Sequence, residues 1–185
     1  MKKLSELLAS KLGSNIFTGV VLLVASALIG AFVVPSYRQG EPAIAGRRAM
    51  DFSLDLNGKP AHLSDFRGQV VVLNFWFSSC PPCIAEIDSL NALQRKIAGR
   101  GGTVLGVSVD SDLGSYERFL RDHHVPFPNY HDTSQKIAWN YGTSVFPETY
   151  IIGADGRIAR KLIGQQEWDS PDITSYIESL LPISK

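Results

Sequence analysis

The chain has 185 residues, of which 44% are hydrophobic and 19% charged, and this composition is that of a folded protein rather than a disordered one. Its 18 Lys and Arg balance its 18 Asp and Glu, but from Asp51 onward 12 basic residues stand against 16 acidic ones. A mildly acidic body argues against nucleic-acid binding, which requires a basic surface.

The chain begins with a short basic tail and a long apolar segment. Residues 12–37 contain no charged side chain, and the 19 residues 16–34 are mostly Val, Leu, Ile, Ala and Phe. At a rise of about 1.5 Å per residue, such a helix nearly matches a hydrocarbon core of roughly 30 Å. We therefore expect an N-terminal tail over 1–11 and a transmembrane anchor over 12–37, followed by a linker over 38–49.

A cleaved signal peptide is the alternative interpretation of this segment, because the Ala-Ser-Ala at 25–27 resembles a cleavage site. Cleavage there would leave an exposed apolar end, so an uncleaved anchor is favoured. The lysines of the tail resemble the basic start of a signal sequence, which favours an N-terminus inside the cell. The sequence thus predicts a single-pass protein of the cell (inner) membrane whose catalytic domain faces the periplasm or extracytoplasmic side.

The folded domain is expected over 50–185. Its first part, residues 52–66, predicts a β-hairpin, because Asn57-Gly58 supplies the positive φ angles of a tight turn. Residues 69–77, QVVVLNFWF, form a continuous apolar run that is typical of a strand buried on both faces.

Helices and strands alternate through the rest of the domain. Apolar side chains recur at helical spacing from Cys83 to Ile97, and a second buried strand follows over 103–109. Further predicted elements are helices over 114–123 and 134–142, a hairpin over 148–164 and a terminal helix over 170–181. This order predicts an α/β domain with a mixed sheet.

The chain contains two cysteines, Cys80 and Cys83, in the stretch NFWFSSCPPCIAE. A structural disulfide between them would close almost no loop, and the histidines show no spacing that would complete a zinc site. Thiol–disulfide exchange needs an accessible thiolate with a resolving thiol beside it. The predicted strand leads directly into a helix, and the N-terminus of that helix stabilises negative charge on the first sulfur. We therefore interpret Cys80 as the nucleophile and Cys83 as the resolving thiol.

The stretches NFWFSSCPPC (74–83) and YGTSVFPETYIIGADGRI (141–158) resemble the thioredoxin superfamily, in particular its membrane-anchored TlpA/ResA/CcmG-like thiol–disulfide oxidoreductases. The resemblance covers about residues 50–183. It implies a thioredoxin fold, with a central mixed sheet flanked by helices and an extra N-terminal β-hairpin, preceded by one transmembrane helix. It also implies a redox-active Cys80–Cys83 disulfide.

The resemblance extends to residues outside the cysteine pair. Pro147 matches the family's cis-proline, so Phe146 and Pro147 are expected to lie against the disulfide and to meet the substrate. Glu86 and Glu148 match acids of the family. If both carboxylates face the sulfurs, they raise the thiol pKa values, and either could accept the proton of the resolving thiol.

Three further residues are expected to contact the substrate: Trp76, which matches the family, and Pro81 and Pro82 between the cysteines. Because proline has no N–H, neither proline can donate a hydrogen bond to the Cys80 sulfur. A strongly oxidising pair needs a heavily stabilised thiolate, so the motif predicts a reducing pair. Ser79 and Phe77 depart from the residues common in the family at these positions.

The expected activity is reduction of protein disulfides outside the cytoplasm. By resemblance, the substrates could be apocytochromes c or a copper-site assembly protein. Neither GxGxxG nor a P-loop occurs in the chain, so no cofactor is expected and electrons would come from a membrane thiol donor.

Two alternative functions use the same cysteines. A thiol peroxidase shares the fold, but it needs a hydroxyl and a cation near the cysteine, and Phe77 stands where peroxiredoxins keep a threonine. A copper-binding chaperone would need a histidine near the final hairpin, and His131 is the candidate for that role. No metal is expected in the leading interpretation.

Overall fold

The structure is a computed structural model that describes residues 19–27, 44–56 and 58–182. The chain divides into two units, Met1–Ala43 and Ile44–Lys185. In the first unit residues 19–27 are helical, and the rest of the predicted tail and anchor lies outside the described residues. Of the helices that the structure describes, none combines the length and the apolar character needed to cross a membrane.

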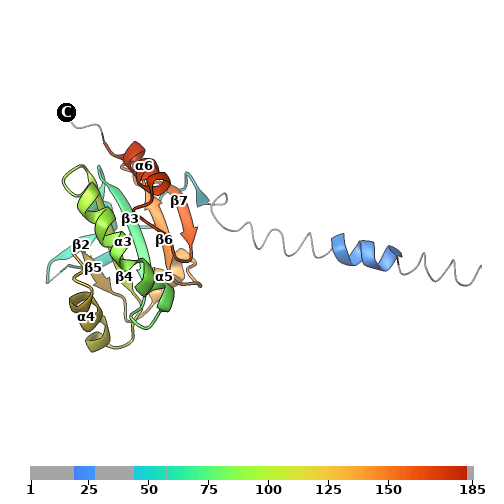
Figure 1. The fold of residues 1–185 in the computed structure, drawn as a ribbon, viewed down its shortest axis with the longest axis horizontal. Helices are drawn as coiled ribbons and strands as arrows, with labels where there is room; N and C mark the ends of the chain where they lie inside the picture. The colour runs from blue at the N-terminus through green and yellow to red at the C-terminus, as the bar shows by residue number, and fades with distance from the viewer. Residues whose placement is uncertain (1–18, 28–43, 57, 183–185) are drawn as a thin grey trace, which may run out of the picture. The chain divides into compact units, whose positions relative to one another are not determined.

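A five-stranded mixed sheet forms the centre of the second unit (Figure 1). Its strands, in the order β5-β4-β3-β6-β7, are β5 (Asn129–His131), β4 (Gly102–Ser108), β3 (Val70–Trp76), β6 (Glu148–Ile152) and β7 (Ile158–Ile163). β4 runs parallel to β3 and β5, whereas β6 is antiparallel to β3 and β7. Every residue of β3 and β4 is buried, which explains why their sequences are mostly apolar. The predicted α/β fold with a mixed sheet is confirmed.

Helices and the N-terminal segment cover the two faces of this sheet. The helices are α3 (Pro81–Ile97), α4 (Leu113–Asp122), α5 (Lys136–Tyr141) and α6 (Pro171–Leu180). On one face, side chains of α3, α4 and α6 pack against Val72 and Trp76 of β3 in one apolar cluster. On the other face, Phe75 of β3 packs with Leu54 of the N-terminal segment and Ala138 of α5. The layers are those of a thioredoxin-like domain.

The N-terminal segment of the domain differs from the expected linker and hairpin. β1 (Ser53–Asp55) and β2 (Pro60–His62) pair antiparallel, but η1 (Leu63–Phe66) is a 3₁₀ helix where the sequence pattern predicts a strand. The second unit also includes residues 44–49, which the sequence pattern assigns to the linker. The N–H of Ala49 donates to the carbonyl of Gly156 at 2.9 Å, and neighbouring backbone groups pair with the start of β7. Because these contacts are made by the backbone, the side chains show no pattern that reveals them.

Candidate active site

The end of β3 leads directly into the helix that holds both cysteines. Cys80 is the N-cap of α3, and Pro81 and Pro82 occupy the first helical positions, where a missing N–H costs no helical hydrogen bond. The backbone N–H of Cys83 donates to the Cys80 sulfur at 3.2 Å. Such a helix N-terminus stabilises a thiolate on the capping sulfur.

The two cysteines form a disulfide, with an S–S distance of 2.09 Å and a Cα–Cα distance of 5.2 Å. This confirms the predicted pairing. In the oxidised protein both sulfur-bearing residues are nearly covered, while Pro81 beside them is exposed and Pro82 is half-buried. The two prolines therefore form accessible surface next to the disulfide, and their contact with a substrate stays a prediction.

The proline turn before β6 lies at the same edge of the sheet as the disulfide. The peptide bond between Phe146 and Pro147 is cis, as the resemblance implies. Phe75 of β3 pairs with Glu148 of β6, so the two residues before Glu148 lie where β3 ends. The ring of Phe146 meets the ring of Phe77 edge-on, with centroids 5.5 Å apart. This contact joins the proline turn to the segment that leads into Cys80.

Glu86 is buried one helical turn after Cys83, with 1% of its surface exposed. One carboxylate oxygen accepts a hydrogen bond from Asn74 Nδ2 at 2.9 Å. The other accepts from the backbone N–H of Gln166 and from Trp168 Nε1, both at 3.0 Å. The carboxylate is thus fully enclosed by neutral donors and has no cation in its hydrogen bonds.

Burial raises the pKa of Glu86 from its ordinary value of 4.5 to about 7, although the hydrogen bonds from Gln166, Trp168 and Asn74 oppose the shift. A carboxyl group with this pKa can accept or release a proton near neutral pH. Its position one turn from Cys83 suits the predicted role as proton acceptor for the resolving thiol.

The raised pKa has a consequence for stability. Between pH 4.5 and about 7 the folded protein holds a proton on Glu86 that the unfolded chain has lost, so stability falls as the pH rises through this window. We expect the free energy of unfolding of the wild type to decrease by about 3 kcal/mol relative to Glu86→Gln over that range. Urea unfolding of both proteins at several pH values measures the difference. A constant difference would show that Glu86 is not protonated on folding.

Glu148 lies on the opposite face of the sheet from Glu86. It shares the face of its strand partner Phe75, which belongs to the cluster away from α3. Its Oε1 atom accepts hydrogen bonds from Thr143 Oγ1 at 2.9 Å and Tyr150 Oη at 2.5 Å, and it forms an ion pair with Lys161 Nζ at 2.8 Å. The hypothesis that both carboxylates face the sulfurs is therefore wrong for Glu148. Successive residues of a strand point to opposite faces of the sheet. Glu148 directly follows Pro147, so its buried contacts hold the proline turn from the face opposite to α3.

Trp76 belongs to the core rather than to an open substrate surface. It is 4% exposed, its ring packs on Phe119 at 4.3 Å, and its Nε1 donates to Asn129 Oδ1 at 3.1 Å. Trp76 is the last residue of β3 and therefore lies close to the segment that carries the disulfide, but little of its surface is available to a substrate.

The segment before Cys80 is held by the carboxylate of Asp110, which the sequence does not predict as a site residue. Both oxygens of Asp110 accept from the backbone N–H of Ser78, at 3.1 and 3.0 Å, and the Ser78 hydroxyl donates to Oδ1 at 2.7 Å. Ser108 Oγ donates to the other oxygen at 2.7 Å. His131, the residue considered for copper, pairs through Nε2 with the carbonyl oxygen of Asp110 at 2.7 Å. Asp110 thus orders the approach to the disulfide.

Trp168, Lys161 and Asp110 hydrogen-bond or ion-pair with residues of this site, and the sequence predicts a site role for none of them. Trp168 lies in a short loop before α6, and Lys161 occupies a polar position of a strand. Neither position has a sequence pattern that indicates a role in the site. For Asp110 the sequence offers one indication, its position in the stretch Ser-Val-Asp at the end of a buried strand. An Asp side chain at such a place can accept hydrogen bonds from the backbone of a neighbouring loop.

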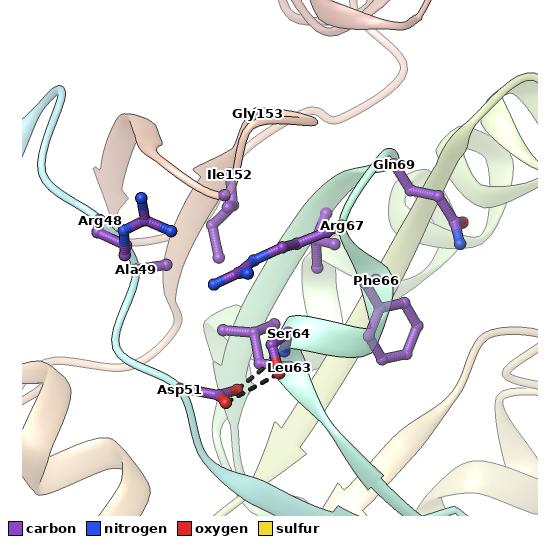
Figure 2. Close-up of a pocket in the computed structure, with 12 residues that line it drawn as sticks. Arg48, Ala49, Asp51, Leu63, Ser64, Phe66, Arg67, Gln69, Ile152 and Gly153 are labelled. Carbon is purple, nitrogen blue, oxygen red and sulfur yellow. Dashed lines mark hydrogen bonds between the residues drawn. The ribbon is translucent and has the colours of Figure 1, made fainter.

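A separate pocket lies at the start of β3 (Figure 2). Arg48 and Arg67 line it together with Gln69 and Ile152, and Asp51 accepts hydrogen bonds from Ser64 at its edge. The disulfide follows the other end of β3, and no residue of this pocket contributes to the redox site. The pocket therefore has no part in the chemistry of the cysteines.

Comparison with known proteins agrees with a redox role for the cysteine pair. The sequence profile of the AhpC/TSA family matches residues 45–161. The thiol-disulfide oxidoreductase ResA of Geobacillus thermodenitrificans is 31% identical over 165 residues, covering 88% of this chain and 94% of that protein. ResA of Bacillus thuringiensis is 28% identical over 169 residues, covering 90% and 96%. A Chlorobium tepidum structure described as a thiol:disulfide interchange protein DsbE superposes with a TM-score of 0.70 at 28% identity, over 75% of this chain and 98% of that one.

Proposed function

Because the chain belongs to the AhpC/TSA family and is a ResA/DsbE-like thiol–disulfide oxidoreductase of the thioredoxin superfamily, we propose that it works as a reductase of protein disulfides. The observation that carries this proposal is the Cys80–Cys83 disulfide at the N-terminus of α3, with the cis-Pro147 turn at the same sheet edge and Glu86 buried one turn away. Proteins with thiols or disulfides are the substrates that the family implies.

In the reductive direction the Cys80 thiolate attacks one sulfur of a client disulfide. A mixed disulfide forms and the client's other sulfur leaves as a thiolate. Glu86 accepts the proton of Cys83, whose thiolate then attacks the Cys80 sulfur. This step closes the Cys80–Cys83 disulfide and releases the second client thiolate, so two electrons pass to the client. A dithiol donor must return two electrons before the next turnover.

Surface next to the site favours a polypeptide client. Trp139 is 82% exposed and Val145 is 52% exposed, and Trp139 lines a cleft with Phe146 and Val109. A contiguous patch of exposed apolar side chains is typical of an interaction site. An extended client segment that crosses Pro147 would bury part of them.

The direction of electron flow is tested by the reduction potential. Pro81 and Pro82 supply no donor to the Cys80 sulfur, which leaves the Cys83 N–H as the one hydrogen bond that the described residues make to it. We expect a potential closer to the roughly −270 mV of thioredoxin than to the roughly −120 mV of the oxidant DsbA. Equilibration of the purified protein in dithiol buffers, followed by thiol alkylation, measures it. A value near that of DsbA would contradict the reductase assignment.

The place of action that we propose is the outer side of the cell membrane. The uncharged segment 12–37 supports a membrane anchor, and the lysines before it support an orientation with the domain in the periplasm or extracytoplasmic space. The clients would be apocytochromes c or a copper-site assembly protein, with a membrane thiol protein as donor. Fractionation of cells that express the full chain tests the anchor, because deletion of residues 12–37 should release the protein from the membrane fraction.

The residues around Cys80 do not favour the peroxidase alternative. Phe77 stands three residues before Cys80 and contacts Phe146, and the charged group that holds Ser78 is the carboxylate of Asp110. A peroxidase site needs a hydroxyl and a cation at this place to polarise the peroxide. A rapid single-turnover reaction of the reduced protein with hydrogen peroxide would reverse this conclusion.

A further inference from the structure

The loop between β7 and α6, residues 164–170, is hydrogen-bonded to α3 at the turn that follows Cys83. The backbone N–H of Gln166 and the indole N–H of Trp168 both donate to one oxygen of Glu86. The backbone N–H of Trp168 donates to Ser89 Oγ at 3.2 Å, and Ser89 Oγ donates to the carbonyl of Glu86 at 2.8 Å. One short loop thus holds the side chain and the backbone of Glu86.

Trp168 is more than a filler of the core. Its side chain is fully buried and packs in the cluster that contains both cysteines. A buried aromatic ring that only filled space could be phenylalanine, whereas the indole N–H of Trp168 points at a buried carboxylate oxygen 3.0 Å away. A hydrogen bond to an ionised group is stronger than one between neutral groups, and this one favours the charged form of Glu86.

We propose that Trp168 is a positioning residue for disulfide exchange: its indole N–H holds the Glu86 carboxylate one helical turn from Cys83, and the β7–α6 loop thereby governs the proton acceptor of the site. This inference rests on the proposed function, since it assigns Trp168 a role through Glu86 and not through contact with a client.

Glu86 accepts hydrogen bonds from neutral groups, and Trp168 is the donor of the β7–α6 loop that a side-chain substitution can remove. The partners on neighbouring elements, Asn74 on β3 and the backbone of Gln166, are neutral. On its own helix Cys83 can ionise once the disulfide is reduced, while Asp88 is exposed to solvent. The β7–α6 loop carries two more carboxylates, Glu167 and Asp169, and both are exposed to solvent. The ion pair of Glu148 with Lys161 lies on the face of the sheet opposite to Glu86.

The test uses the three tryptophans of the full chain as built-in controls. In the oxidised protein labelled with ¹⁵N-tryptophan, we expect the indole N–H signal of Trp168 to shift with a midpoint near pH 7, the pKa of Glu86. Trp76 donates to the uncharged Asn129, and Trp139 is 82% exposed, so neither signal should move at that pH. Glu86→Gln should abolish the shift. A Trp168 signal that is constant from pH 5 to 9 overturns the proposal.

A kinetic measurement then separates positioning from packing. Trp168→Phe keeps the ring and removes the donor, so the midpoint of the rate of client-disulfide reduction against pH should rise by about one unit. In a Glu86→Gln background the same substitution should leave the pH profile unchanged, because the group on which it acts is gone. Tyr141→Phe is the matched control, because it likewise removes one donor from an aromatic ring, here the hydroxyl that donates to the carbonyl of Met50 at 2.6 Å, and it should leave the midpoint unchanged.

The outcomes distinguish this inference from the proposed function. A Trp168→Phe protein whose rate falls equally at every pH has lost packing only, and the positioning role is then wrong. If the variant does not fold, the titration of the wild-type indole signal still decides. A wild type whose indole titrates but which reduces no client disulfide would contradict the reductase assignment and leave the contact between Trp168 and Glu86 established.

Discussion

Replacing Cys80 with serine is expected to abolish disulfide reduction, with a loss of roughly a thousandfold or more, because the substitution removes the attacking sulfur. Cys80 is the N-cap of α3, and its sulfur receives the Cys83 N–H at 3.2 Å, so it is the sulfur that the helix N-terminus stabilises as a thiolate. Turnover of a protein disulfide, with a dithiol as reductant, measures the loss.

Cys83→Ser is the matched variant, and its expected result is different. The Cys80 thiolate can still attack, but no second thiol releases the client, so a stable mixed disulfide should accumulate. Because the chain has no other cysteine, every adduct must be at Cys80. Mass spectrometry of the non-reduced protein detects it. Adducts on the Cys80→Ser protein instead, or turnover that survives in it, would reverse the roles assigned to the two cysteines.

Replacing Lys161 with methionine is expected to destabilise the domain by about 3 to 5 kcal/mol, because it leaves the charge of Glu148 buried without a cation. The side chain of Glu148 is 2% exposed and that of Lys161 is 10% exposed, and the two groups lie 2.8 Å apart. Tyr150 and Thr143 would still donate to Glu148, but neither carries a charge to balance it. Urea unfolding at pH 7 measures the loss, with the m value as a check that both proteins unfold alike.

Two further variants control for the change in side chain. Lys136→Met, on the exposed surface of α5, should alter the stability by no more than about 0.5 kcal/mol. The double variant Lys161→Met with Glu148→Gln should recover most of the loss, since no buried charge then remains. A single Lys161→Met protein within about 1 kcal/mol of the wild type would show that the ion pair contributes little to the stability of the turn at Pro147.

The two buried carboxylates show how much of the site a local sequence pattern can predict. The sequence predicts both Glu86 and Glu148 as site residues, but only the groups that contact them in the structure reveal their roles. Glu86 meets Trp168, which is 82 residues away in the chain, and Glu148 meets Lys161 across a strand pair. Contacts of this kind depend on which face of the sheet a residue occupies and on what packs there.

The amino-acid sequence is enough to predict the α/β element order, the mixed sheet and the redox-active pair. Buried strands require continuous apolar runs, helices require apolar residues at helical spacing, and thiol exchange requires two thiols close together in the chain, so each leaves a local pattern. Three further features are visible only in the folded chain. Residues 44–49 belong to the second unit, Glu148 faces away from the sulfurs, and the β7–α6 loop encloses Glu86. These features depend on backbone pairing, strand alternation and desolvation between segments distant in the chain, and no local pattern records them.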